Sequence, residues 1–383
     1  MQSNWLKIFC ITSMLSLSAC QKPADNTVSH AEKKAGTALA TEEKVLNVYN
    51  WDSYIDPDVL TEFTKETGIN VVYDTFDSSE TLESKLLVGK SGYDIVVPAA
   101  PFLSKQIKAG VFQKLDKSKL SNWKNFDPQT MTLLGTYDAQ NQHAIPYMWG
   151  TTGLGINKAK VQAILGADAA LNGFDLVFKP DNMKKLQACG VAFLDAPSEM
   201  MAAALNYLGK NPESLLEDDY KQAEQLLLSV RPYIRYFNNN QQAADLASGD
   251  ICLAIGWSGD MAQAAMRADE AKNGVELSFI IPKEGAEVWI DTMAIPKDAP
   301  HPNNAHLFLD YMMRPEVIAK VTNFVAYANG NAASLPFVTP AIANDPSIYP
   351  NAEVRKRLFT VHTLPTEIDR TITRAWTKVK TGQ

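Results

Sequence analysis

The sequence predicts an α/β protein of two lobes, each a mostly parallel sheet flanked by helices, with a ligand cleft between them. Its 383 residues, 46% of them hydrophobic, correspond to about two domains of ordinary size. Apolar strands alternate with helices over short links, which favours parallel sheets covered on both faces. The extended segment 143–157 (HAIPYMWGTTGLGIN), rich in glycine and aromatic residues, interrupts this alternation and is expected to cross between the lobes.

The first lobe is expected to contain residues 44–145 and 282–325. Asp56 and Pro57 supply an N-cap and a proline at the first helical position, and glycines such as Gly68 follow the helices. The expected strands of this lobe are 45–49, 69–76, 93–97 and 288–295. Its expected helices are 57–67, 79–88, 102–109, 303–312 and 315–323.

The second lobe is expected to contain residues 146–281 and 326–383. It shows the same alternation of apolar strands with amphipathic helices. Its expected strands are 191–194, 234–237, 251–255 and 277–281. Its expected helices are 198–208, 218–230, 240–248 and 259–272. The last part of the chain has proline-rich loops and a final helix expected at about 368–380.

The N-terminus has the features of a secretory signal. An apolar stretch from Ile8 to Leu17 precedes Leu17-Ser18-Ala19-Cys20, which resembles a bacterial lipobox. We therefore expect residues 1–19 to be removed and Cys20 to carry lipid; the alternative is a secreted protein cut elsewhere. Residues 20–43 are polar and alanine-rich, so they are expected to form a flexible tether. No later segment reaches the roughly 18 apolar residues of a spanning helix, so we expect the rest of the chain to lie outside the cytoplasm; the periplasmic location is what the family resemblance given below implies.

Four cysteines are present, and Cys10 is expected to leave with the signal while Cys20 is lipidated. Cys189 and Cys252 remain. In an oxidising compartment such a pair most simply forms one disulfide, which here would close a loop of about 63 residues. The alternative is a pair of buried thiols.

The composition argues against several functions. The net charge is −7 and there is no basic block, so a nucleic-acid partner is not expected. The sequence contains no phosphate-binding loop, no H-E-x-x-H and no G-x-S-x-G motif, and its five histidines do not have metal-ligand spacing. We therefore expect no enzymatic activity, no cofactor and no metal. A hydrolase would need a constellation of groups that the sequence does not contain.

Aromatic and acidic residues collect where a cleft is expected, because ligands of open α/β sheets bind beyond the carboxyl ends of the strands. Trp51 and Asp52 lie at the end of the first strand, and Trp257 and Asp260 follow the strand 251–255. The full set of candidates is Trp51, Asp52, Ser53, Tyr54, Phe102, Glu199, Trp257, Asp260, Trp289, Asp291 and Tyr327.

These side chains suit a short alkyl chain that carries ammonium groups. One cation–π contact contributes about 0.5–2 kcal/mol, and hydrogen bonds from ammonium to carboxylate are stronger than neutral ones. Structural alternatives exist for each candidate. Asp260 could be a helix N-cap, Asp52 could belong to a turn, and Glu199 would be favoured in a first helical turn by the helix dipole. The aromatic residues could be ordinary core residues.

Several segments resemble the periplasmic polyamine-binding proteins of bacterial ABC importers, above all the putrescine-binding branch. They are YNWDSYI, KETGINVVYDTFDSSETLESKL, GYDIVVPAAPFL, PYMWGTTGLGIN, CGVAFLDAPSE, DICLAIGWSGD, IPKEGAEVWIDTMAIP and RAWTKVKTG. The resemblance implies a two-lobed type II solute-binding fold, a polyamine held between the lobes by the candidates above, and a Cys189–Cys252 disulfide. It also implies a permease and a separate ATPase subunit as partners, and we expect a monomer.

The sequence departs from that family at a few positions. Relatives have Trp-Ser-Asp or Trp-Thr-Glu where this chain has Trp51-Asp52-Ser53, and they have serine after the VVP run where Ala99 stands here. Trp289 occupies a position that is Phe in the putrescine branch and tends to be Trp in spermidine binders, which favours a longer amine. The ligand class is unaffected, and its identity stays open between putrescine and spermidine. A sensor on the same fold, or a receptor for another amine or an amino acid, are the alternatives.

Overall fold

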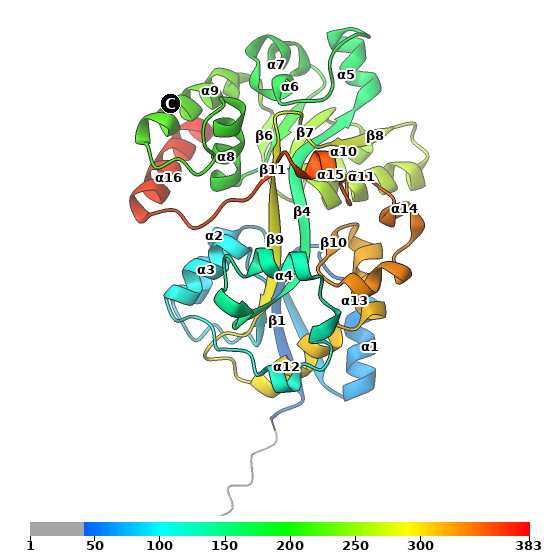
Figure 1. The fold of residues 1–383 in the computed structure, drawn as a ribbon. Coiled ribbons are helices and arrows are strands. Elements are labelled where there is room, and N and C mark those ends of the chain that lie inside the picture. The colour runs from blue at the N-terminus through cyan, green and yellow to red at the C-terminus, as the bar shows by residue number, and fades with distance from the viewer. Residues whose placement is uncertain (1–41) are drawn as a thin grey trace, which may run out of the picture. The chain divides into compact units, whose positions relative to one another are not determined.

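The structure is a computed structural model, and it describes residues 42–383 (Figure 1). The predicted signal peptide, Cys10, the lipidation site Cys20 and nearly all of the predicted tether lie outside the described residues. Among residues 42–383, no helix combines the length and the apolar character needed to cross a membrane.

The first lobe, the lower one in Figure 1, is built around β1, which pairs in parallel with β2 on one side and β3 on the other. Its strands are β1 (Val45–Trp51), β2 (Asn70–Phe76) and β3 (Ile95–Val96). Its helices are α1 (Pro57–Thr67), α2 (Ser79–Leu87), α3 (Ala100–Lys108), α4 (Pro128–Leu134), α12 (Pro302–Met312) and α13 (Pro315–Val325). The predicted caps of α1 are confirmed: the Asp56 side chain accepts the Asp58 N–H, and Gly68 ends the helix at φ 71°.

The second lobe, the upper one, has β5 and β7 as a parallel pair with β6 at the edge. Its strands are β5 (Val191–Phe193), β6 (Tyr236–Phe237), β7 (Leu253–Trp257) and β8 (Leu277–Ile280). Its helices are α5 (Lys158–Leu165), α6 (Asp175–Phe178), α7 (Pro180–Leu186), α8 (Pro197–Tyr207), α9 (Glu217–Val230), α10 (Gln242–Ser248), α11 (Ser258–Ala271) and α16 (Thr366–Thr381). Cys189 and Cys252 form a disulfide with a Cα–Cα distance of 5.5 Å, as predicted.

Two long strands run through both lobes and connect them: β4 (Ala144–Asn157) and β9 (Ala286–Ala294) (Figure 1). They pair antiparallel with each other, and β4 continues into the second lobe as the partner of β7 and β8. The extended crossing predicted at 143–157 is therefore confirmed. The remaining short elements are β10 (Ala328–Asn329), β11 (Leu358–Phe359), α14 (Pro340–Ala343) and α15 (Ala352–Arg355).

Some predicted boundaries were wrong. The strand expected at 234–237 shrinks to two residues because a 3₁₀ turn, Arg231–Tyr233, occupies the chain before it. The strand expected at 93–97 keeps only Ile95–Val96. Helices α5, α6 and α7 were not predicted. They are short, with four to eight residues each, and α6 is apolar apart from Asp175, so their formation depends on tertiary packing rather than on helical periodicity.

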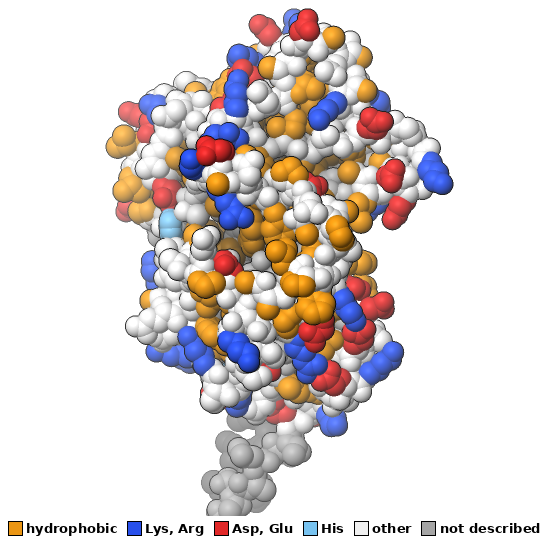
Figure 2. Space-filling view, turned by 45° about the vertical axis from the view of Figure 1, so that its right-hand side comes forward, with side chains coloured by type: hydrophobic (Ala, Val, Ile, Leu, Met, Phe, Trp, Pro, Cys, Tyr) orange, Lys and Arg blue, Asp and Glu red, His pale blue; other side chains and the backbone are white. Residues whose placement is uncertain are grey.

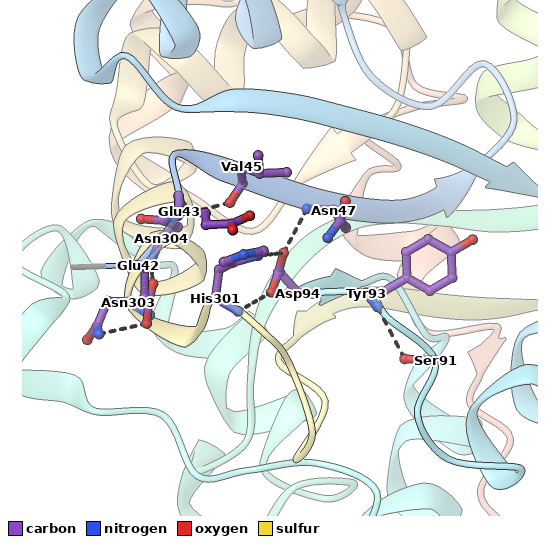
Figure 3. A network of polar contacts seen from close by, with 10 residues as sticks. All are labelled: Glu42, Glu43, Val45, Asn47, Ser91, Tyr93, Asp94, His301, Asn303 and Asn304. Carbon is purple, nitrogen blue, oxygen red and sulfur yellow. Dashed lines mark hydrogen bonds and ion pairs between the residues drawn. The ribbon is translucent and has the colours of Figure 1, made fainter. Parts of the chain in front are cut away.

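The first described residues are attached to α12 and to the chain just before β3 (Figure 3). The Glu42 carboxylate accepts the backbone N–H groups of Asn303 and Asn304, each at 3.0 Å, at the helix N-terminus, where anionic groups are favoured. Buried Asp94 accepts the backbone N–H of His301 at 2.6 Å and contacts the ring of the same histidine. Asp94 also accepts the backbone N–H of Asn47 in β1 at 2.8 Å, so these contacts hold the start of the strand that ends at Trp51.

Candidate ligand-binding site

A cavity of about 270 Å³ lies where the two lobes meet. Figure 2 shows hydrophobic side chains gathered at this waist of the molecule. The aromatic candidates that line the cavity are Trp51, Tyr54, Phe102, Trp257, Trp289 and Tyr327. The acidic candidates that line it are Asp52, Glu199, Asp260 and Asp291. Ser53 alone among the predicted residues does not line the cavity; it is exposed, with φ 53°.

Asp291 reaches the cavity from β9, two residues after Trp289, so both side chains lie on one face of the strand. Its side chain is buried, and its Oδ2 accepts the Tyr54 hydroxyl at 2.9 Å. Burial raises the pKa of Asp291 to about 8; the Tyr54 hydrogen bond opposes this increase, and the charge of Glu199 adds to it. Among the described residues, the Asp291 carboxyl group therefore has a tyrosine hydroxyl and no cation as its partner.

Asp260 lies in the first turn of α11, and the structure excludes its role as the N-cap. Trp257 is the N-cap residue, and no side chain caps the helix there. The Asp260 carboxylate instead accepts the Tyr327 hydroxyl at 2.7 Å, while that hydroxyl accepts the Asp260 backbone N–H at 3.1 Å. Burial raises the pKa of Asp260 to about 6, against the effects of the Tyr327 hydrogen bond and the Arg267 charge.

Two indole rings, one from each lobe, are held in place by hydrogen bonds that their N–H groups donate. Trp51, at the end of β1, donates to the Val97 carbonyl at 3.0 Å. Trp257, at the end of β7, donates to Glu199 Oε2 at 2.9 Å. The two ring centroids are 5.9 Å apart at an interplanar angle of 73°, so together they form two walls of one box. Glu199 also accepts the Thr152 hydroxyl at 2.7 Å, and burial raises its pKa.

The cavity extends beyond the predicted residues, toward α2, α3 and α16. Sequence analysis did not identify Glu80 and Glu83 of α2, Lys105 of α3, or Glu287 of β9, all of which line it. Lys105 forms ion pairs with Glu83 at 3.1 Å and with Asp369 of the other lobe at 3.5 Å. The period of two along β9 would have identified Glu287, because it shares a face with Trp289 and Asp291.

Gly259 is required by the close approach of Tyr327, because a Cβ there would lie 2.3 Å from the Tyr327 ring. We expect Gly259→Ala to lower the free energy of unfolding by about 1–3 kcal/mol through overpacking, and to change the near-ultraviolet circular dichroism of the aromatic cluster. Gly89→Ala is the control, since a Cβ at Gly89 meets no atom within 4 Å. It should cost stability only through its positive φ and leave the aromatic signal unchanged. An unchanged signal in Gly259→Ala would contradict the role assigned to Gly259.

Comparisons with known proteins agree with this architecture. Residues 58–350 match the family described as bacterial extracellular solute-binding protein. The chain is 55% identical to the putrescine-binding periplasmic protein SpuD of Pseudomonas aeruginosa, covering 91% of this chain and 95% of the relative. It is 54% identical to the putrescine-binding periplasmic protein PotF of Escherichia coli, covering 90% and 94%. A solved structure of a putative spermidine/putrescine ABC transporter from Listeria monocytogenes superposes with a TM-score of 0.80 at 30% identity, covering 89% of this chain and 100% of that one.

Proposed function

The chain belongs to the family of bacterial extracellular solute-binding proteins, and we propose that it binds a linear polyamine, putrescine or a close analogue, between its lobes. It would deliver this ligand to an ABC permease that is energised by a separate ATPase subunit. The relatives with 54–55% identity over 90% or more of the chain are putrescine-binding periplasmic proteins, which supports this ligand class and the periplasm as its location. We also propose a monomer, anchored by lipid on Cys20.

One observation carries the proposal: Asp291 is buried and Asp260 half-buried in one aromatic cavity, and both carboxyl groups have tyrosine hydroxyls, not cations, as their hydrogen-bond partners. Burying a carboxylate without a counter-charge is costly, so these groups favour a ligand that brings positive charge with it. The flat apolar rings around them can contact methylene groups. An alkyl diamine satisfies both requirements.

In the proposed complex, Asp260 and Asp291 hold one ammonium group, and Asp52 or Glu199 holds the other. Trp51 comes from the first lobe and Trp257 from the second, so a ligand between them contacts both lobes at once. Such a ligand favours the closed arrangement, since only that arrangement offers both sets of contacts. The crossing strands β4 and β9 provide the connection about which the lobes would close.

The test is a thermal-shift series with putrescine, cadaverine, spermidine, agmatine and 4-aminobutyrate, followed by calorimetry. A ligand present at 100 times its Kd should stabilise the protein by about 2.7 kcal/mol, which is readily seen as a higher Tm. We expect the amines to stabilise the protein and 4-aminobutyrate, which carries a carboxylate, to do so far less. No stabilisation by any of the amines would overturn the proposal. Polyamine uptake by a deletion strain distinguishes transport from sensing.

A further inference from the structure

Glu287 is a buried carboxyl group that faces the ligand cavity and has no partner. It is 8% exposed, its Oε2 is buried without a hydrogen bond, and it lines the cavity. Two other lining acids have charged partners: Glu83 pairs with Lys105, and Asp195 pairs with Lys380 and accepts the Trp376 indole N–H. Glu287 therefore differs from them in lacking a positive or hydrogen-bonding neighbour among the described residues.

The charges nearest to Glu287 are negative. Burial first, then the charges of Glu199 and Glu213, raise the pKa of Glu287 well above its usual value. Glu80 of α2 also lines the cavity, but it is an exposed residue, so Glu287 is the more deeply buried of the two acids. Glu80 of α2, Glu199 of α8 and Glu287 of β9 thus all line the cavity, and among the described residues none of these three carboxyl groups forms an ion pair. Only a positively charged group from a ligand would stabilise this arrangement in its ionised form.

Strand β9 sets the distance between this acidic region and the one at Asp291. Glu287, Trp289 and Asp291 alternate on one face of the strand, so the two acidic residues flank the indole. At about 3.3 Å per residue, the Cα atoms of Glu287 and Asp291 are separated by roughly 13 Å, and strand side chains stand nearly perpendicular to the sheet. A four-carbon diamine spans about 6 Å between its nitrogen atoms, whereas a triamine with four- and three-carbon spacers spans about 11 Å, from standard bond lengths and angles.

From these observations we propose that Glu287 binds a cationic group at the far end of the cavity and selects a linear triamine over a diamine. The inference rests on the proposed function, because it takes Asp260 and Asp291 as the site of the first ammonium. The middle ammonium would lie over Trp289, where an indole face favours a cation.

The experiment compares wild type with Glu287→Gln by calorimetry, using spermidine as the triamine, putrescine as the diamine and agmatine as a guanidinium-ended amine. We expect Glu287→Gln to weaken spermidine binding at least tenfold and to change putrescine binding by less than threefold. Glu276→Gln, the same change at an exposed acid outside the lining residues, should alter neither. The ligand-free Tm of Glu287→Gln should be no lower than that of wild type, because the variant removes an unpartnered buried acid.

The outcomes separate the two proposals. If wild type binds none of the amines, the proposed function itself fails. If wild type binds putrescine but Glu287→Gln leaves spermidine binding unchanged, or weakens both amines equally, the selective role of Glu287 is overturned while the function stands. If agmatine binding weakens and spermidine binding does not, the group recognised is a guanidinium, and the triamine proposal is wrong.

Discussion

Asp291→Asn is expected to weaken putrescine binding by about thirtyfold at least. Asparagine preserves the size of the side chain and an oxygen that can accept the Tyr54 hydroxyl, so the cavity keeps its shape while the negative charge is lost. Removing one partner of a buried, hydrogen-bonded charge pair costs about 2–5 kcal/mol. That cost corresponds to a factor of about thirty to several thousand in Kd. Asp260→Asn should behave similarly, because its carboxylate is half-buried in the same cavity and accepts the Tyr327 hydroxyl.

From the sequence alone we expected a smaller effect on binding, at least tenfold or about 1.4 kcal/mol for the alanine variants, because the sequence does not reveal how far these two acids are removed from solvent. Asp168→Asn is a suitable control, since Asp168 is exposed and does not line the cavity. Calorimetry on the three variants and wild type measures the effect directly. Affinities within threefold of wild type for both Asp260→Asn and Asp291→Asn would show that neither acid holds an ammonium.

A site residue can be predicted from the sequence when its position follows from the strand or helix next to it in the chain, and not when it depends on contacts between distant segments. Trp51, Asp52, Trp257 and Asp260 were predicted because each directly follows a strand, and the carboxyl end of a strand is where a ligand binds in an open α/β sheet. The resemblance to a known family also included Ser53, but this residue is exposed, has φ 53° and does not line the cavity. A pattern in the sequence does not determine such a turn conformation.

The acidic region of the cavity depends on long-range structure. Glu80 and Lys105 lie on helices of the first lobe, and Asp369 lies on α16 at the other end of the chain. These residues come together only because the two lobes are arranged about β4 and β9. The secondary-structure propensities of the local sequence do not reveal that arrangement. Glu287 is different: its place on β9, two residues before Trp289, could have been inferred from strand alternation once the strand was extended to Ala286.

Polyamine affinity is expected to fall by roughly a hundredfold or more between pH 8 and pH 5. The ligand stays charged throughout, because alkyl ammonium groups titrate near pH 10, as lysine does. The protein does change, because burial raises the pKa of Asp291 to about 8 and that of Asp260 to about 6. At a pH below these pKa values the two carboxyl groups are neutral in the ligand-free protein. Binding an ammonium group then requires that they lose their protons. Each pH unit below the pKa costs about 1.36 kcal/mol for each acid that must ionise. The decline therefore begins near pH 8, well above the pH 3 region that the ordinary pKa of a carboxyl group would suggest.

Lowering the pH weakens ligand binding, but it has the opposite effect on the folding stability of the ligand-free protein. An acid whose pKa is higher in the folded state than in the unfolded state binds more protons when folded, so its contribution to stability is present at low pH and is lost as pH rises toward 8. Ligand binding reverses this by favouring the carboxylates, and the Tm increase produced by putrescine should therefore grow from pH 5 to pH 8. Calorimetry in two buffers of different ionisation enthalpy should detect proton release on binding near pH 7, and Asp291→Asn should release fewer protons. A Kd that stays constant over this range, with no proton release, would mean that these carboxyl groups do not ionise to hold the ligand.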